Sequence, residues 1–175
     1  MPTMYTVLMP VDGDEGRVTA QAAMVAELPA ADQEVKVVML FVFDDRERAE
    51  VTTPSQVGAN ADAIDLLEDL GIEIEQLSRH GNPVAEIIVA AEEVAADLIV
   101  MGGRKRSPLG SALFGSVSQD VLLEADRPVV ITGAVEPTAD PSHRCQSCGE
   151  EYFTDPDVEI STCRSCGGTK VERVR

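Results

Sequence analysis

The chain has 175 residues, 44% of them hydrophobic, which suffices for one domain of ordinary size with an aliphatic core and a small appendix. Thirty-one Asp and Glu residues against 14 Lys and Arg residues give a formal net charge of −17. DNA and anionic membranes are bound through clusters of Lys and Arg, so this charge argues against nucleic acid and membrane surfaces as partners.

Lysine is scarce in the chain, with only Lys36, Lys105 and Lys170. Many acids with few lysines are typical of proteins from salt-loving, haloarchaeal-like microbes, and an ordinary acidic cytosolic protein is the alternative. All apolar runs are shorter than the ~20 residues of a membrane-spanning helix. Residues 1–11 have no basic segment and no cleavage pattern typical of export. We therefore expect a cytoplasmic protein, in which cysteines stay reduced.

Strand-like and helix-like segments alternate along the first 132 residues. Five apolar runs are predicted to be strands, at residues 5–11, 35–43, 72–77, 97–101 and 128–132. Apolar residues at helical spacing predict helices at residues 15–28, 59–70, 83–94 and 116–124. The charged residues 44–56 are predicted to form a loop. The run at 72–77 alternates apolar and acidic residues, which indicates a strand near a sheet edge.

This order of elements predicts an α/β fold, with a five-stranded parallel sheet and helices on both faces. Ligands of such sheets bind at the carboxyl ends of the strands, where the strand order reverses. The loops at those ends are the ones after Asp12, Phe43 and Met101. We assign residues 1–133 to this α/β domain. Residues 134–143 contain two prolines and lack periodicity, so we interpret them as a linker to a small unit at residues 144–175.

The only cysteines of the chain form two CxxC pairs, Cys145 with Cys148 and Cys163 with Cys166, and a glycine follows each pair. Two intervening residues let the backbone fold so that both thiolates converge on one tetrahedral ion. We interpret the four cysteines as the ligands of a structural zinc site in a zinc ribbon, although iron accepts the same ligands. Two disulfides would need an oxidising compartment, and a redox CxxC normally occurs once, beside a βαβ unit. His143 is interpreted as a bystander.

The tail has few apolar residues to form a core without metal. Its basic residues are offset by acidic ones, which disfavours nucleic acid as a ligand of the ribbon. We expect instead a protein partner at the ribbon, or packing against the main domain.

A basic, glycine-containing loop follows the predicted strand at residues 97–101. It leads through Gly102, Arg104 and Lys105 to Gly115 and Ser116, at the start of a predicted helix. The free N–H groups and the dipole of a helix N-terminus favour an anion, so the loop is a candidate phosphate site. A solvated basic loop is the alternative, with Ser116 as a helix cap, and spacing alone does not decide between the two.

The segment VMGGRKRSPLGSALFGSVSQDVL resembles the nucleotide loop of the universal stress protein family, whose motif is Gly, two residues, Gly, nine residues, Gly, then Ser or Thr. Gly102 and the pair Gly115-Ser116 match this motif, whereas its second glycine falls at Lys105. VLMPVDG resembles the first strand of the family and LFVFD its second. The resemblance covers about residues 4–132.

This resemblance implies a stress-response protein that binds ATP or a related adenine nucleotide. Asp12 and Val42 would flank the adenine, and the amides of Ser116 and Val117 would hold the terminal phosphates. The family also implies a homodimer formed through the last strand, from Val129 to Thr132. The full set of implied nucleotide-binding residues is Pro10, Asp12, Val42, Met101, Gly102, Arg104, Lys105, Gly115, Ser116 and Val117.

Lys105 supports a second hypothesis, because a side chain at the motif glycine resists close backbone approach. In that hypothesis the chain is a nucleotide-free dimeric scaffold whose zinc ribbon recruits a protein partner. The sequence contains no visible catalytic constellation, since neither His80 nor His143 has an obvious nucleophile partner. Any ATP hydrolysis is expected to be slow or incidental.

Overall fold

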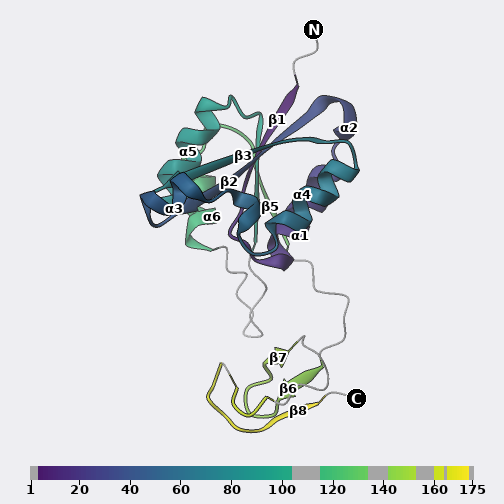
Figure 1. The fold of residues 1–175 in the computed structure, drawn as a ribbon, viewed down its shortest axis with the longest axis vertical. Coiled ribbons are helices and arrows are strands. Elements are labelled where there is room, and N and C mark those ends of the chain that lie inside the picture. The colour runs from purple at the N-terminus through teal and green to yellow at the C-terminus, as the bar shows by residue number, and fades with distance from the viewer. Residues whose placement is uncertain (1–3, 104–114, 134–141, 153–159, 164, 174–175) are drawn as a thin grey trace. The chain divides into compact units, whose positions relative to one another are not determined.

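The computed structural model describes residues 4–103, 115–133, 142–152, 160–163 and 165–173. The chain divides into two compact units, Met1–Val135 and Glu136–Arg175. The first unit is a layered α/β structure and the second contains a small three-stranded sheet (Figure 1). Most of the predicted linker, residues 134–141, lies outside the described residues.

Five parallel strands form the sheet of the first unit in the order β3-β2-β1-β4-β5, which confirms the predicted sheet. The order reverses between β1 and β4, because β2 and β3 follow on one side of β1 while β4 and β5 lie on the other. β3 is an edge strand, as its alternating pattern indicated. The strands are β1 (Tyr5–Pro10), β2 (Val35–Phe43), β3 (Glu73–His80), β4 (Leu98–Gly102) and β5 (Val129–Thr132).

Helices cover both faces of this sheet (Figure 1). One layer contains α1 (Glu15–Ala26) and α4 (Asn60–Asp69), and the other contains α5 (Pro83–Glu93) and α6 (Ser116–Glu124). Successive strand residues point to opposite layers, so Met39 of β2 is buried in the first core and Leu40 in the second. Burial on both faces explains why β2 is a nearly continuous apolar run. None of the helices in the described ranges combines the length and hydrophobicity needed to cross a membrane.

Side-chain caps determine where α1 and α5 begin. Asp14 accepts a hydrogen bond from the backbone N–H of Arg17 at 3.0 Å, and Asn82 accepts one from Ala85 at 3.1 Å. Each cap satisfies an N–H group that the first helical turn leaves without a partner. Pro83 occupies the first position of α5, as the sequence predicted.

Residues 44–56 do not form the simple loop that was predicted, since they contain α3 (Arg46–Val51) and η1 (Pro54–Gln56). Asp45 caps α3 by accepting the N–H of Arg48 at 3.2 Å. No residue of α3 is buried, so this helix has no apolar face for a periodicity argument to detect. The cap at Asp45 marks the start of this helix.

Two other elements differ in extent from the prediction. A short helix, α2 (Ala31–Glu34), follows α1 and ends directly before β2. β3 continues to His80, past the predicted end at residue 77, because its backbone pairs with β2 as far as Phe43. Pairing with a neighbouring strand extends β3 beyond its alternating segment.

The second unit is built around β6 (His143–Cys145), which pairs antiparallel with β7 (Glu151–Tyr152) and β8 (Val171–Arg173). Its core contains the buried side chains of Cys145, Tyr152 and Cys163. Two of these three residues are cysteines, so the packing of the unit depends on what the cysteines bind.

Candidate functional site

A pocket of about 210 Å³ lies at the carboxyl ends of β1, β2 and β4 in the first unit. Residues of α1 and the N-terminal turns of α5 and α6 complete its walls. This is the position where the strand order reverses, which is the usual ligand position in open parallel sheets. The lining residues are Pro10, Val11, Asp12, Arg17, Gln21, Leu40, Phe41, Val42, Pro83, Ile87, Met101, Gly102, Gly115, Ser116, Val117 and Ser118.

The pocket forms where β1 and β4 stop pairing. Their ladder pairs Val7 with Leu98 and Leu8 with Ile99. Beyond it, the amide of Gln21 donates hydrogen bonds to the carbonyl of Pro10 at 2.7 Å and to that of Val100 at 2.9 Å. Gln21 is only 1% exposed, so its side-chain amide, rather than water, satisfies these two carbonyls. A side chain of α1 thus bridges the two diverging strands.

The N-terminus of α6 forms one wall of the pocket. Gly115 is its N-cap residue, and no side chain of the described residues caps the helix there. The first turn of α6 contains no acidic residue, and Ser116 and Val117 line the pocket. Backbone N–H groups without a side-chain cap, together with the helix dipole, make this wall suited to an anion.

Asp12 and Arg17 are the charged residues among the described lining residues, and they form an ion pair. The Nη2 atom of Arg17 lies 2.7 Å from Oδ2 of Asp12, and Nε donates to Oδ1 at 3.2 Å. Two parallel contacts of this kind hold both groups in a defined orientation. Asp14, the cap of α1, lies 3.6 Å from the same Nη2 atom.

The structure brings eight of the ten predicted nucleotide-binding residues together in this pocket: Pro10, Asp12, Val42, Met101, Gly102, Gly115, Ser116 and Val117. The other two, Arg104 and Lys105, lie outside the described residues. Sequence reasoning missed the contributions of Arg17 and Gln21 from α1. Helical periodicity identifies the buried face of α1 but not the part of it that borders a pocket. The signal available in the sequence was Arg17 itself, a basic residue in the first turn of a helix that otherwise begins with the acidic residues Asp14 and Glu15.

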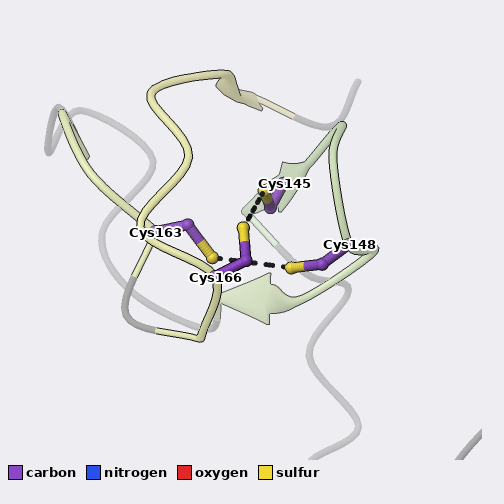
Figure 2. A group of neighbouring side chains, drawn as sticks. All are labelled: Cys145, Cys148, Cys163 and Cys166. Atoms are coloured by element: carbon purple, nitrogen blue, oxygen red, sulfur yellow. Dashed lines mark hydrogen bonds between the residues drawn. The ribbon is translucent and has the colours of Figure 1, made fainter.

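The four cysteines of the second unit also converge, with their Sγ atoms all within 4.8 Å of one another (Figure 2). Cys145 and Cys166 have their sulfurs 3.7 Å apart, as do Cys148 and Cys163. A tetrahedral ion at about 2.3 Å from each sulfur places the sulfurs about 3.8 Å apart. The cluster therefore has the dimensions of a four-cysteine metal site.

Hydrogen bonds to the sulfurs favour the thiolate form at two of these cysteines. The backbone amide of Cys148 is the main cause that lowers the pKa of Cys145. A hydrogen bond from the side chain of Tyr152, followed by the amide of Cys166, lowers the pKa of Cys163 to about 6. Thiolates are the form in which cysteine binds metal.

The proximity of the thiols has the opposite effect on Cys148. The amide of Glu150 lowers the pKa of Cys148, but the neighbouring thiols, Cys166 first, and desolvation together raise it to about 12. Four thiolates at this separation repel one another unless a cation lies among them. The cluster is thus suited to a divalent ion. His143 does not belong to it, and its Nδ1 lies 3.0 Å from Oγ of Ser142.

A five-stranded parallel α/β sheet with a pocket at its reversal point defines a protein of the doubly wound α/β class. The sequence profile of the universal stress protein family matches residues 4–133, and the chain belongs to this family. The "Universal stress protein in QAH/OAS sulfhydrylase 3'region" of Thermus aquaticus is 31% identical over 137 residues, 72% of this chain and 96% of the relative. Universal stress protein MJ0577 of Methanocaldococcus jannaschii is 34% identical over 65 residues, which span 37% of this chain and 40% of the relative.

Two solved structures support the same assignment. A universal stress protein from Archaeoglobus fulgidus has a TM-score of 0.58 and 29% identity, covering 73% of this chain and 97% of that one. A structure of the universal stress protein from the same organism in complex with dAMP has a TM-score of 0.57 and 28% identity, covering 75% of this chain and 99% of that one.

Proposed function

We propose that the pocket at the ends of β1, β2 and β4 binds ATP or a related adenine nucleotide, and that the chain acts in the stress response. The observation that carries this proposal is the meeting, in one pocket, of the motif residues from both ends of the nucleotide loop with the N-terminus of α6. The similar protein from Archaeoglobus fulgidus, solved with dAMP, adds support.

Each group of lining residues has a role in this proposal. Asp12 and Val42 flank the adenine, with Pro10 and Met101 as apolar neighbours. Gly102 lies along the ribose and phosphates. The terminal phosphates are held by the amides of Ser116 and Val117 and by the Ser116 hydroxyl. Arg104 and Lys105 add positive charge where the second motif glycine is missing. The described lining residues include no nucleophile paired with a base, so the proposal is binding rather than catalysis.

Calorimetric titration of the full chain with ATP, ADP and AMP tests the proposal, at low and at molar potassium chloride. We expect salt-sensitive binding, and its loss in Gly115→Val. The backbone at Gly115, with φ −59° and ψ 152°, is compatible with valine, so the fold should persist while the branched side chain occupies the phosphate position. Gly133→Val is the matched control, because a Cβ at Gly133 has no atom within 4 Å; it should bind as the wild type does.

Lys105→Gly restores the family motif and distinguishes two roles for Lys105. Tighter binding means that the loop has diverged from ATP use, and weaker binding means that Lys105 contacts phosphate. Absence of binding by the wild type and by Lys105→Gly, at both salt concentrations, would contradict the nucleotide proposal. It would favour the second candidate, a nucleotide-free dimeric scaffold whose ribbon recruits a protein, which the lysine at a motif glycine supports.

Both candidates include a homodimer formed through Val129–Thr132. β5 is an edge strand whose four residues are all half-buried, so its outer backbone groups are available to pair with a second chain. Native mass spectrometry of the full chain reports oligomeric state, bound nucleotide and metal in one measurement.

We also propose that the four cysteines hold a structural zinc ion, with iron as the alternative that elemental analysis distinguishes. All four positions of the site are protein ligands, which is the arrangement of structural rather than catalytic zinc. The domain division that goes with it is an α/β domain at 1–133, a linker at 134–143 and a zinc ribbon at 144–175. Reduced thiols suit the cytoplasmic location that we propose, and the ribbon is the candidate surface for a protein partner.

A further inference from the structure

Arg17 is a pocket residue that the nucleotide-loop motif does not include. Its Nε and Nη2 atoms face Asp12, at 3.2 and 2.7 Å, and Nη2 also lies 3.6 Å from Asp14. These contacts hold the guanidinium from one side. Nη1 makes no hydrogen bond within the described residues, so its two N–H groups remain for another acceptor.

The stem of Arg17 lies against the end of β4. A Cβ at Gly102 would lie 2.7 Å from Cβ of Arg17 and 3.2 Å from its Cδ. Contacts under 3.0 Å require something to move, so the stem and Gly102 are packed together without room for a side chain. Arg17 therefore reaches from the end of β4, at Gly102, to the end of β1, at Asp12.

Arg17 contributes the positive side-chain charge among the described lining residues of the pocket. Asp12 is 57% exposed, and it and Arg17 are the charged groups among the described lining residues. Without Arg17, Asp12 would lose its ion-pair partner in the pocket, in a chain whose net charge is already −17. A carboxylate and a phosphate group in one pocket repel each other, because both are negatively charged. An uncharged ligand would not experience this repulsion.

We propose that Arg17 is a specificity-determining residue that selects phosphorylated adenine nucleotides over the nucleoside adenosine. This inference rests on the proposed adenine-nucleotide function. The guanidinium neutralises Asp12, and the N–H groups of Nη1 donate to a phosphate oxygen of the ligand. A guanidinium is suited to both tasks, because it is permanently charged and its fork of donors can bind two acceptors at once.

The test is the ratio of the affinities for AMP and for adenosine, measured by calorimetry on the full chain. Arg17→Met keeps an unbranched stem against Gly102 and removes the charge. It should reduce the ratio of the affinities for AMP and adenosine by about tenfold or more. The affinity for AMP should fall, and the affinity for adenosine should change little. Arg17→Lys keeps the charge and should restore most of the ratio.

Lys36→Met is the matched control. Lys36 is also paired with two acids, Glu75 at 2.7 Å and Glu73 at 3.8 Å, and its side chain is 28% exposed against 25% for Arg17. It lies at the amino end of β2, whereas the pocket lies at the carboxyl ends of the strands. This variant makes the same change in net charge away from the pocket, so the ratio should remain that of the wild type.

Asp12→Asn tests the same inference if Arg17→Met does not fold. It removes the closer of the two acidic neighbours of the guanidinium and leaves Asp14, 3.6 Å from Nη2, so the AMP-to-adenosine ratio should rise. A ratio unchanged in Arg17→Met, or one that does not rise in Asp12→Asn, would overturn the role of Arg17 while leaving the adenine-nucleotide function in place. A wild-type chain that binds neither AMP nor adenosine would overturn both.

Discussion

Gln21 shows how one side chain can create a pocket within a sheet. Parallel strands that pair along their whole length leave no space between them. β1 and β4 separate after Leu8 and Ile99, and the buried amide of Gln21 donates to a carbonyl on each of them. The separation is tolerated because these carbonyls keep a hydrogen-bond donor.

Gln21→Leu is therefore expected to destabilise the α/β unit. The leucine fills a similar volume but leaves the carbonyls of Pro10 and Val100 without this donor, at a cost of roughly 1–3 kcal/mol for each group left unsatisfied. Urea denaturation followed by circular dichroism measures the effect. Gln33→Leu, at an exposed position of α2, is the control and should change stability by less than about 0.5 kcal/mol. Equal urea midpoints of unfolding for the two variants would contradict the stabilising role of the Gln21 hydrogen bonds.

The ribbon is the element whose folding depends most directly on a few side chains. Its described core consists of Cys145, Tyr152 and Cys163, with Ile160 and Val171 partly buried against them. So small an apolar core contributes little on its own, whereas structural zinc contributes roughly 10–16 kcal/mol in peptides of this kind. The metal, rather than the hydrophobic effect, should hold this unit in its fold.

We expect one zinc ion per chain, and Cys148→Ser or Cys163→Ser should unfold residues 144–175 while leaving the α/β unit folded. Elemental analysis gives the metal content, and NMR spectra of the full chain show which signals lose their dispersion. Ser165→Ala is the control. Ser165 lies between the two cysteines of the second CxxC pair and is not a proposed ligand, so the variant should retain both the metal and the fold. Protein prepared without chelators that contains neither zinc nor iron would refute the prediction.

The charge of the whole molecule sets how its stability depends on salt. With 31 acids and 14 bases, the folded chain holds many like charges at close range. Salt shortens the range of their repulsion, from about 10 Å at 0.1 M to about 3 Å at 1 M ionic strength. The unfolded chain spreads the same charges further apart, so screening favours the folded state.

Thermal stability is therefore expected to rise between low and molar potassium chloride. Melting curves followed by circular dichroism measure it. Sodium chloride at equal concentration is the control and should act alike, because screening depends on ionic strength rather than on the cation. Melting temperatures that stay flat or fall would count against adaptation to salt and leave an ordinary acidic protein.

The sequence by itself determined the α/β architecture of the first unit and the convergence of the four cysteines of the second. Alternation of apolar runs with helical spacing predicts a parallel sheet covered on both faces, because each element must bury its own apolar side. The spacing of Cys145, Cys148, Cys163 and Cys166 likewise predicts their convergence, since a CxxC turn brings its own two thiols together. Such information is local, or repeats at a regular period, and it can be read along the chain.

Only the tertiary structure showed what α1 contributes to the pocket. Arg17 and Gln21 lie on a helix whose periodicity indicates only burial. The partners of Gln21, Pro10 and Val100, belong to two different strands, and Asp12, the partner of Arg17, follows the end of β1. α3 was missed for a different reason, since a local cap begins it and it has no buried apolar face that periodicity could detect. Side-chain contacts between different elements leave no periodic signal. They arise only in the folded chain, where β1 lies beside β4 and α1 packs against both strands.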